Sequence, residues 1–310
     1  MKRTLLLYES RYGFTKEAIE KISMILGPSK MCTVEEFKNE YKDFDFFVIA
    51  SSVNYEKISE KIYKFVCENK KWLTHKPIAV ICTCLSKERS KQYIKPLLDI
   101  LGESVVFKKT ILGKLTLDKL NKEDYLSMKK FSDMSGMPFE NIDKSNTYEI
   151  VNCGLEIKRK RDFDFKKNKE DIRKYIDEFI SDHNTSTLCT GFDKNVRSTA
   201  IEYTYIDDYM FFISEGGEKF ANIIMNPRVS ISIYNDFHSM DNLGGIQING
   251  LASIIPKESE DYKEFMKRKK INVEKLSVDM NLIKVKLENV EFIWSKLKSK
   301  GYEVKQYYKY

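Results

Sequence analysis

The sequence predicts two domains of different fold class, a doubly wound α/β domain followed by a mainly β domain. Its 310 residues exceed the size at which a single hydrophobic core usually keeps growing. The first half alternates continuous apolar runs with helical segments, whereas the second half alternates apolar and polar residues over short stretches. We expect the two domains to comprise residues 1–165 and 166–310.

The composition fits a globular protein with two cores. Hydrophobic residues make up 42% of the chain and aromatic residues 13%. The net charge of +7 favours anionic ligands such as phosphates, but positive and negative residues are interspersed, so we expect no nucleic-acid partner. The apolar runs are too short to span a bilayer, which leaves peripheral contact with a membrane open. The six cysteines come with neither a CxxC pair nor a secretory signal, which predicts a cytoplasmic protein.

Four apolar runs in the first half predict parallel strands, because helical segments separate them. The runs are Thr4–Tyr8, Phe46–Ala50, Ile78–Cys82 and Val105–Phe107, and the helical segments are Thr15–Leu26, Ser59–Glu68 and Ser90–Leu101. Continuous apolar strands of this kind are typical of a parallel sheet that is covered by helices on both faces. Ligands of such sheets bind outside the carboxyl ends of the strands, so the loops after the runs are the candidate site.

The first of these loops has the features of an anion site. Hydroxyl groups of Ser10 and Thr15 flank the start of the first predicted helix, where backbone N–H groups and the helix dipole favour negative charge. Gly13 lets the backbone curl around a ligand. Ser and Thr also cap helices that bind nothing, so the turn by itself leaves a simple cap open.

The segment Leu6–Ala18 resembles the FMN-phosphate signature of flavodoxins. Arg11 stands where many flavodoxins have a small hydroxyl residue, and here the loop resembles the flavodoxin-like, menaquinone-dependent protoporphyrinogen oxidases of bacteria. The long segment 113–136 is similar to the insertion of that branch, although it also fits an amphipathic helix packed on the domain. The resemblance implies FMN contacts for Ser10, Arg11, Tyr12, Gly13, Phe14, Thr15, Ser52, Asn54, Tyr55, Cys84 and Leu85. Tyr55 is the candidate for stacking on the flavin ring, with an exposed loop tyrosine as the alternative.

A connector is expected between Asn141 and Lys167, where the sequence is short, charged and irregular. Its basic run Lys158–Arg161 predicts a solvated segment rather than a binding site, because phosphate recognition needs converging side chains. The helix that we expect over Asn168–Ser181 either closes the first domain or opens the second.

Short strands at close intervals predict an antiparallel sheet or barrel after residue 184. The candidate strands are Thr185–Thr190, Thr199–Tyr205, Tyr209–Ser214, Val229–Tyr234, Ile246–Ile255 and Leu282–Leu287, with helices at Gly217–Asn226 and Ser259–Lys269. This order resembles the pyridoxamine 5′-phosphate oxidase-like FMN-binding split barrel over Asp171–Lys296.

Local motifs support that second resemblance and imply a second phosphate site. Arg197, Ser198 and Thr199 would approach the phosphate or ribityl chain, Ser214 and Lys219 would complete the phosphate site, and Gln247 would reach the ring. Proteins of this family usually complete the flavin site with a second subunit, which implies a homodimer. The further Arg and His residues with which pyridoxamine oxidases hold their substrate have no matching run here, so the resemblance does not extend to the substrate.

These observations predict an FMN-dependent oxidoreductase with one or two FMN per chain, in which the flavin carries the electrons or hydride. Its partner would be a redox substrate, such as a quinone, a porphyrinogen or a small planar molecule, or an electron-donor protein. No catalytic side chain is assigned, since the sequence has neither a triad nor a paired-carboxylate motif. Alternatives are an electron-transfer module without its own substrate and a haem- or flavin-binding protein without turnover. His75, His183 and His238 lack metal-ligand spacing, so no metal site is expected, and His238 is the best candidate for haem.

Overall fold

The chain forms two compact units in the computed structural model, which describes residues 2–136, 138–164 and 170–310. One unit ends at residue 165 and the other begins at residue 166. The predicted boundary itself lies outside the described residues. Each unit has its own hydrophobic core.

The first unit is built on a parallel sheet. Its strands are β1 (Thr4–Glu9), β2 (Ser29–Cys32), β3 (Phe46–Asn54), β5 (Ile78–Cys84) and β6 (Val105–Leu112). They pair in the order β2-β1-β3-β5-β6, and the short strand β4 (Lys57–Ile58) adds antiparallel to β3. This is the doubly wound order of flavodoxin-like sheets, so the predicted α/β class is confirmed. Sequence reasoning missed β2, because three of its four residues are not buried and form no apolar run.

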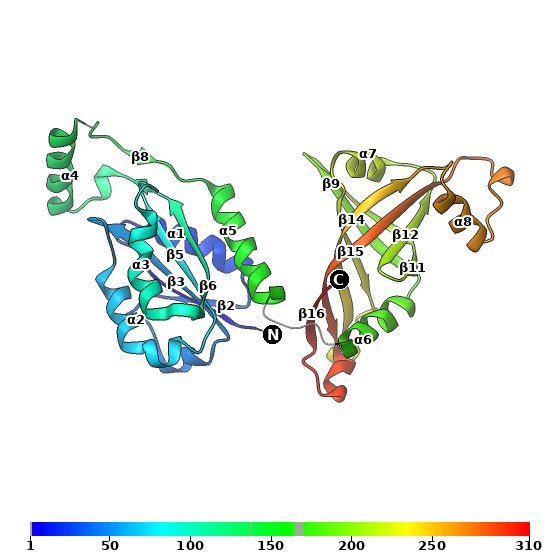
Figure 1. Ribbon diagram of the computed structural model, residues 1–310, viewed down its shortest axis with the longest axis horizontal. Helices are drawn as coiled ribbons and strands as arrows, with labels where there is room; N and C mark the ends of the chain where they lie inside the picture. Colours follow the sequence, from blue (N-terminus) through cyan, green and yellow to red (C-terminus); the bar gives the residue numbers. More distant parts are fainter. Residues whose placement is uncertain (1, 137, 165–169) are drawn as a thin grey trace. The chain divides into compact units, whose positions relative to one another are not determined.

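Helices cover both faces of this sheet (Figure 1). One face carries α1 (Phe14–Ile25) and α5 (Thr147–Arg159), and the other carries α2 (Glu60–Leu73) and α3 (Ser90–Leu101). Every residue of the internal strand β5 is buried, as a strand covered on both faces requires.

The expected connector between residues 141 and 167 is largely a helix, so that prediction was wrong. Asn146 caps α5 by accepting a hydrogen bond from the backbone N–H of Tyr148. Ile150, Cys153 and Ile157 then form a buried stripe at helical spacing, which the surrounding charges concealed in the sequence. Arg161, the last residue of the basic run, is only 1% exposed and forms an ion pair of 2.7 Å with Asp162.

The segment after β6 forms α4 (Lys122–Ser135), with a small ribbon of β7 (Lys114–Leu115) and β8 (Ile142–Asp143) at its base. Figure 1 shows α4 outside the two helical layers of the first unit. Asn121 caps this helix through the backbone N–H of Asp124. This helix forms part of the candidate site.

The second unit is mainly an eight-stranded antiparallel sheet, which confirms the second predicted class. Its strands are β9 (Thr185–Phe192), β10 (Asn195–Glu202), β11 (Thr204–Ile206), β12 (Tyr209–Ser214), β13 (Arg228–Tyr234), β14 (Gly244–Ile255), β15 (Asn281–Trp294) and β16 (Lys305–Lys309). They pair in the order β10-β9-β13-β14-β15-β12-β11, and β16 pairs with β15. Three helices complete the unit, namely α6 (Glu170–Ser181), α7 (Glu218–Met225) and α8 (Glu260–Arg268).

The barrel core follows from strict alternation along the strands. In β13, Val229, Ile231 and Ile233 are buried, while the residues between them face outward. The predicted strand Thr199–Tyr205 is divided in two, because buried Tyr203 leaves the ladder and its hydroxyl donates to the backbone oxygen of Ile180.

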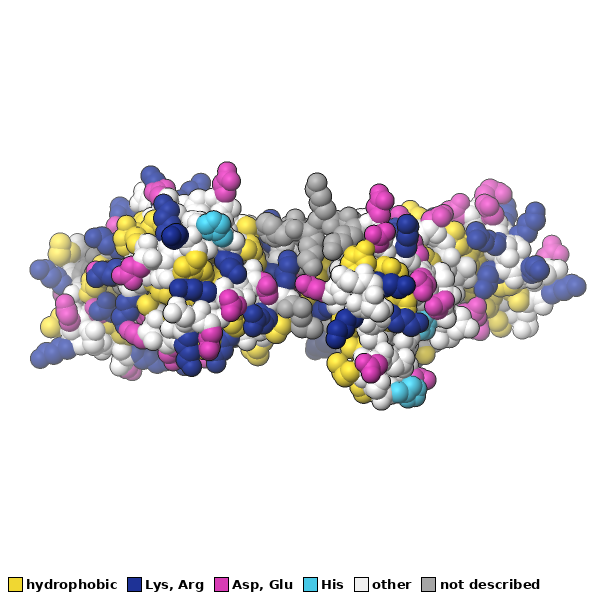
Figure 2. Space-filling model, turned by 90° about the horizontal axis from the view of Figure 1, so that it is seen from below, with side chains coloured by type: hydrophobic (Ala, Val, Ile, Leu, Met, Phe, Trp, Pro, Cys, Tyr) yellow, Lys and Arg dark blue, Asp and Glu magenta, His cyan; other side chains and the backbone are white. Residues whose placement is uncertain are grey.

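On the face seen in Figure 2, basic and acidic side chains are intermixed in both units. Among the described residues, no helix is long and apolar enough to cross a membrane.

Candidate functional site

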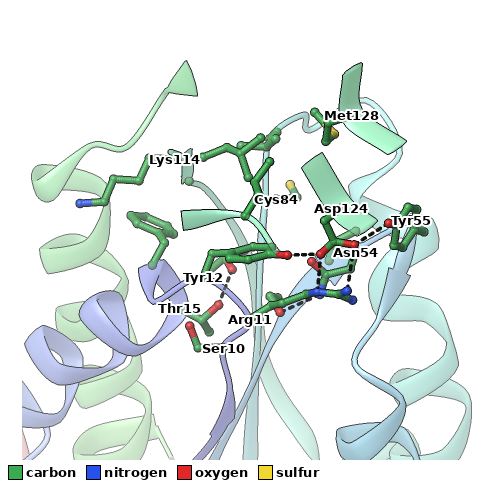
Figure 3. A pocket seen from close by; sticks show the side chains of 18 of the residues that line it. Ser10, Arg11, Tyr12, Thr15, Asn54, Tyr55, Cys84, Lys114, Asp124 and Met128 are labelled. Atoms are coloured by element: carbon green, nitrogen blue, oxygen red, sulfur yellow. Dashed lines mark hydrogen bonds and ion pairs between the residues drawn. The ribbon is translucent and has the colours of Figure 1, made fainter. Parts of the chain in front are cut away.

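A cavity of about 610 Å³ lies in the first unit, at the carboxyl ends of β1, β3 and β5 and beside α4 (Figure 3). Its lining includes every predicted site residue of this unit except Gly13, namely Ser10, Arg11, Tyr12, Phe14, Thr15, Ser52, Asn54, Tyr55, Cys84 and Leu85. The structure therefore brings together three loops that are far apart in the sequence.

One end of the cavity is rich in hydrogen-bond donors. Gly13 precedes α1 with a φ of 93°, a conformation that favours glycine, and its N–H donates to Ser10 Oγ at 3.1 Å. The first N–H groups of any α-helix lack partners within the helix, so those of α1 can serve a ligand. Thr15 is 1% exposed, and its Oγ1 lies 2.8 Å from Oγ1 of Thr83 at the end of β5. This end suits an anion.

The other end of the cavity is aromatic and apolar. Met128 of α4 and Tyr55 lie away from Ser10 and Thr15 (Figure 3), and Tyr12 and Tyr93 also line the cavity. Tyr55 sits in the turn between β3 and β4 with a φ of 48°. Cys84 is buried, and burial raises the pKa of its thiol, whose Sγ–H donates to the backbone oxygen of Ser86. This end suits a planar ring.

Arg11 is held by a carboxylate of α4. Its Nε and Nη2 contact the two oxygens of Asp124 at 2.7 and 2.9 Å. The same guanidinium lies 5.9 Å from the ring centroids of both Tyr12 and Tyr55. The guanidinium is therefore engaged with α4, and its contact with a phosphate stays a prediction.

The donor set fits FMN in outline. Hydroxyls and helix N–H groups at one end can accept a phosphate without a metal, and the aromatic end offers walls for the isoalloxazine ring. Among the described residues, no cluster of three or more His, Cys, Asp or Glu side chains could hold a metal ion.

In the second unit, three predicted residues gather around the turn between β12 and α7. Ser214 Oγ accepts a hydrogen bond from the N–H of Gly216, and Lys219 donates to the backbone oxygen of Gly216. Arg197 forms an ion pair of 3.6 Å with Glu218. Burial lowers the pKa of Lys219, and the positive charge of Arg197 lowers it further.

The remaining predicted residues of this unit are spread over the sheet. Ser198 and Thr199 are consecutive in β10, so their side chains point to opposite faces. Gln247 lies on β14, which β9 and β13 separate from β10. Its exposed side chain points outward, on the same face as Ser198. One chain alone therefore does not bring Gln247 to Arg197.

Sequence reasoning missed several residues of the cavity. Thr83 directly follows the third apolar run, and its place at a strand end could have identified it. Asp124 belongs to α4, and no motif marks it, because its role depends on how the inserted helix folds back. Met128 is part of the apolar spacing that predicts a helix in this segment, but it was not predicted as a site residue.

Comparison with known proteins covers both units. Residues 5–141 match the family described as flavodoxin domain, and residues 172–294 match the family described as pyridoxamine 5′-phosphate oxidase. A Schizosaccharomyces pombe protein named as a pyridoxamine 5′-phosphate oxidase homolog is 26% identical over 142 residues, which are 33% of this chain and 74% of that protein.

Solved structures are similar to this chain at low identity. Campylobacter jejuni ChuZ is 19% identical, with 50% of this chain and 70% of that chain covered and a TM-score of 0.34. A putative pyridoxamine 5′-phosphate oxidase from Listeria innocua is 17% identical, with 39% and 97% covered and a TM-score of 0.32. From its two family matches, the chain joins a flavodoxin-like domain to a pyridoxamine 5′-phosphate oxidase-like split barrel.

Proposed function

We propose that the chain is an FMN-dependent oxidoreductase whose first unit holds the flavin in the cavity between α1 and α4. The observation that carries this proposal is the polarity of the cavity, with buried hydroxyls and helix N–H groups at one end and aromatic side chains at the other. Bound FMN supplies the electron or hydride transfer. The chain then needs no catalytic acid or base of its own.

The side chains would divide the work of binding. Ser10, Thr15 and Thr83 would hold the phosphate together with the N–H groups of α1. Tyr55 and Met128 would bound the ring and keep water from it, because both line the aromatic end.

We infer a second FMN site at Arg197, Ser214 and Lys219, completed by a second copy of the chain. Two cations and a hydroxyl around one turn suit a phosphate dianion. Gln247 reaches no such site in its own chain, but it lies on an outward face that another copy can cover. Light scattering tests the homodimer, and a strictly monomeric protein that still binds flavin in the barrel would oppose it.

A second candidate function is electron transfer between two flavins in one chain, without a substrate. Matches to two families on one chain favour it. Steady-state assays with quinones, porphyrinogen and nicotinamide donors separate the two functions, since only the oxidoreductase turns over a substrate. An electron-donor protein would serve either function as partner. We propose a cytoplasmic location, because the thiols of all six cysteines are free.

The decisive experiment measures flavin content in the purified full-length chain. We expect a flavin spectrum and up to two FMN per chain at saturation. Thr15→Val should weaken binding of the first flavin about tenfold or more, and Arg197→Ala that of the second, each without effect on the other. A wild-type protein that holds no FMN at saturating flavin would refute the proposed function.

A further inference from the structure

One carboxylate joins three separate parts of the cavity wall. Asp124 is 5% exposed and accepts hydrogen bonds from Tyr12 and Tyr55, the latter at 2.5 Å, besides its two contacts with Arg11. Tyr12 and Arg11 belong to the loop after β1, whereas Tyr55 belongs to the turn between β3 and β4. Figure 3 shows these side chains converging on Asp124 at the edge of the cavity.

The protonation states make these contacts strong. Burial raises the pKa of Asp124, but the hydrogen bonds from Tyr12 and Tyr55 and the charge of Arg11 outweigh it, so that its pKa lies below the ordinary value. Burial and the Asp124 hydrogen bond raise the pKa of Tyr12, and the hydrogen bond to Asp124 raises that of Tyr55. At neutral pH an ionised carboxylate therefore faces two protonated tyrosines and a guanidinium, and the hydrogen bonds are charge-assisted.

Besides Asp124, the Tyr55 side chain meets Ser127 of the same helix and the Arg11 guanidinium, which is itself paired with Asp124. Tyr55 is 63% exposed, and both Tyr55 and Glu56 have positive φ values, of 48° and 60°. Glu56 is anchored separately, because both of its carboxylate oxygens accept from Nη1 of Arg89, at 2.8 and 2.7 Å. The turn thus has a contact of its own outside α4, whereas the Tyr55 ring is held by α4, chiefly through Asp124.

The same carboxylate fixes the helix that borders the aromatic end. Met128 lies four residues after Asp124, on the same face of α4, and lines the cavity. Among the described residues, α4 adds none to the buried core clusters of the unit, and its Tyr125 packs edge-on against Phe139. Asp124 supplies the contacts of α4 with the loop after β1 and with the turn between β3 and β4.

We propose that Asp124 is a positioning residue that holds α4 and the Tyr55 ring over the aromatic end of the cavity. We call the contacts of Asp124 with Arg11, Tyr12 and Tyr55 the latch. In this arrangement Arg11 binds Asp124 rather than the phosphate. The inference rests on the proposed function only where it speaks of flavin. Without the Asp124 charge, the aromatic end opens to solvent, while the polar end around Thr15 keeps its structure.

Hydrogen exchange on the full-length protein tests the latch without any flavin. In Asp124→Asn, amides of 122–135 should exchange at least about tenfold faster, because loss of one charge-assisted hydrogen bond corresponds to about that factor. Amides of α1 should be unchanged. Glu123→Gln is the matched control, since it removes a charge from the exposed neighbouring position of the same helix. Unchanged exchange in α4 of a folded Asp124→Asn protein would overturn the proposal.

A second measurement addresses the ring end. FMN bound to Asp124→Asn and to Tyr55→Phe should be quenched by iodide at least about twofold more than in wild type and Glu123→Gln, and its visible spectrum should shift. Tyr55→Phe keeps the ring but loses the hydroxyl that bonds Asp124 and Ser127, so it tests the attachment of the ring to α4 even if Asp124→Asn fails to fold, and Ser127→Ala shows how much of the effect comes from Ser127. Equal quenching in Tyr55→Phe and wild type would refute the role of Asp124 in positioning the ring. If wild type binds no FMN, the proposed function fails, and the exchange experiment still decides the latch.

Discussion

The hydroxyl pair of Thr15 and Thr83 allows a test that separates stability from flavin binding. The two Oγ1 atoms are 2.8 Å apart, and the residues are 1% and 5% exposed. One hydroxyl donates to the other, which leaves a single hydroxyl hydrogen of the pair for a phosphate oxygen. Replacing either threonine by valine keeps the branched shape of the side chain and removes one of the two hydrogen-bonded hydroxyls.

The expected magnitudes differ for the two quantities. Thr15→Val leaves the buried hydroxyl of Thr83 without its partner, which should cost about 1–3 kcal/mol of unfolding free energy. The lost bond to the phosphate should cost about 1.5–3 kcal/mol of binding free energy, or about tenfold to 150-fold in Kd. In Thr15→Val/Thr83→Val both partners are apolar, so stability should largely return while the affinity for FMN stays low.

Urea unfolding of the flavin-free protein and fluorescence titration with FMN measure the two quantities. Thr74→Val serves as control, because its hydroxyl bonds only to Lys70 at the end of α2, on the exposed surface. A double variant that binds FMN in the first unit as tightly as wild type would show that these hydroxyls do not face the phosphate.

Three further predictions concern packing and charge. Gly250→Ala should destabilise the second unit by about 1–3 kcal/mol of unfolding free energy and lower its melting temperature in calorimetry by several degrees, because the new Cβ would lie 2.5 Å from the backbone oxygen of Lys286. Gly245→Ala is the control and should change the melting temperature little. Arg161→Ala should cost about 3–5 kcal/mol in urea unfolding, since it leaves Asp162 buried and unpaired, and Arg161→Met/Asp162→Leu should lose less. The pKa of Lys219 is lowered in the free protein, whereas a phosphate dianion favours its charged form. The affinity of the barrel for FMN should therefore fall as the pH rises, beginning below about pH 10.5. Lys219→Arg should remove this pH dependence in FMN titrations.

Local patterns explain why much of the fold was predictable. Continuous apolar runs identified β1, β3 and β5, and alternation identified β12 with its observed bounds Tyr209–Ser214. The short edge strands β2 and β16 escaped, because they have too few buried residues to produce either pattern. Helix α5 escaped because its apolar stripe is narrow and lies among many charges.

The candidate site was predictable where the backbone alone sets it. The loops after parallel strands meet at one edge of the sheet, so the sequence order of Ser10, Ser52 and Cys84 was enough to expect them in one cavity. Asp124 is separated from Arg11 by 113 positions and sits on an inserted helix, and nothing in the residue types fixes that pairing. Because the sequence does not show this pairing, Arg11 was assigned to the phosphate from its position in the loop alone.

The two proposed phosphate sites differ in how they would hold the same charge, and salt should distinguish them. The first offers buried neutral donors, with Thr15 1% exposed and Arg11 engaged by Asp124. The second relies on Lys219 and on Arg197, whose side chain is 54% exposed and already shared with Glu218. Exposed charges are screened within about 10 Å at 0.1 M salt, and buried neutral donors are affected much less. Thr15→Val retains the barrel site, and Arg197→Ala retains the cavity. Raising the ionic strength from about 0.05 to 0.5 M should therefore weaken FMN binding far more in Thr15→Val than in Arg197→Ala. Equal salt dependence of the two variants in FMN titrations would mean that one kind of site accounts for all the flavin bound.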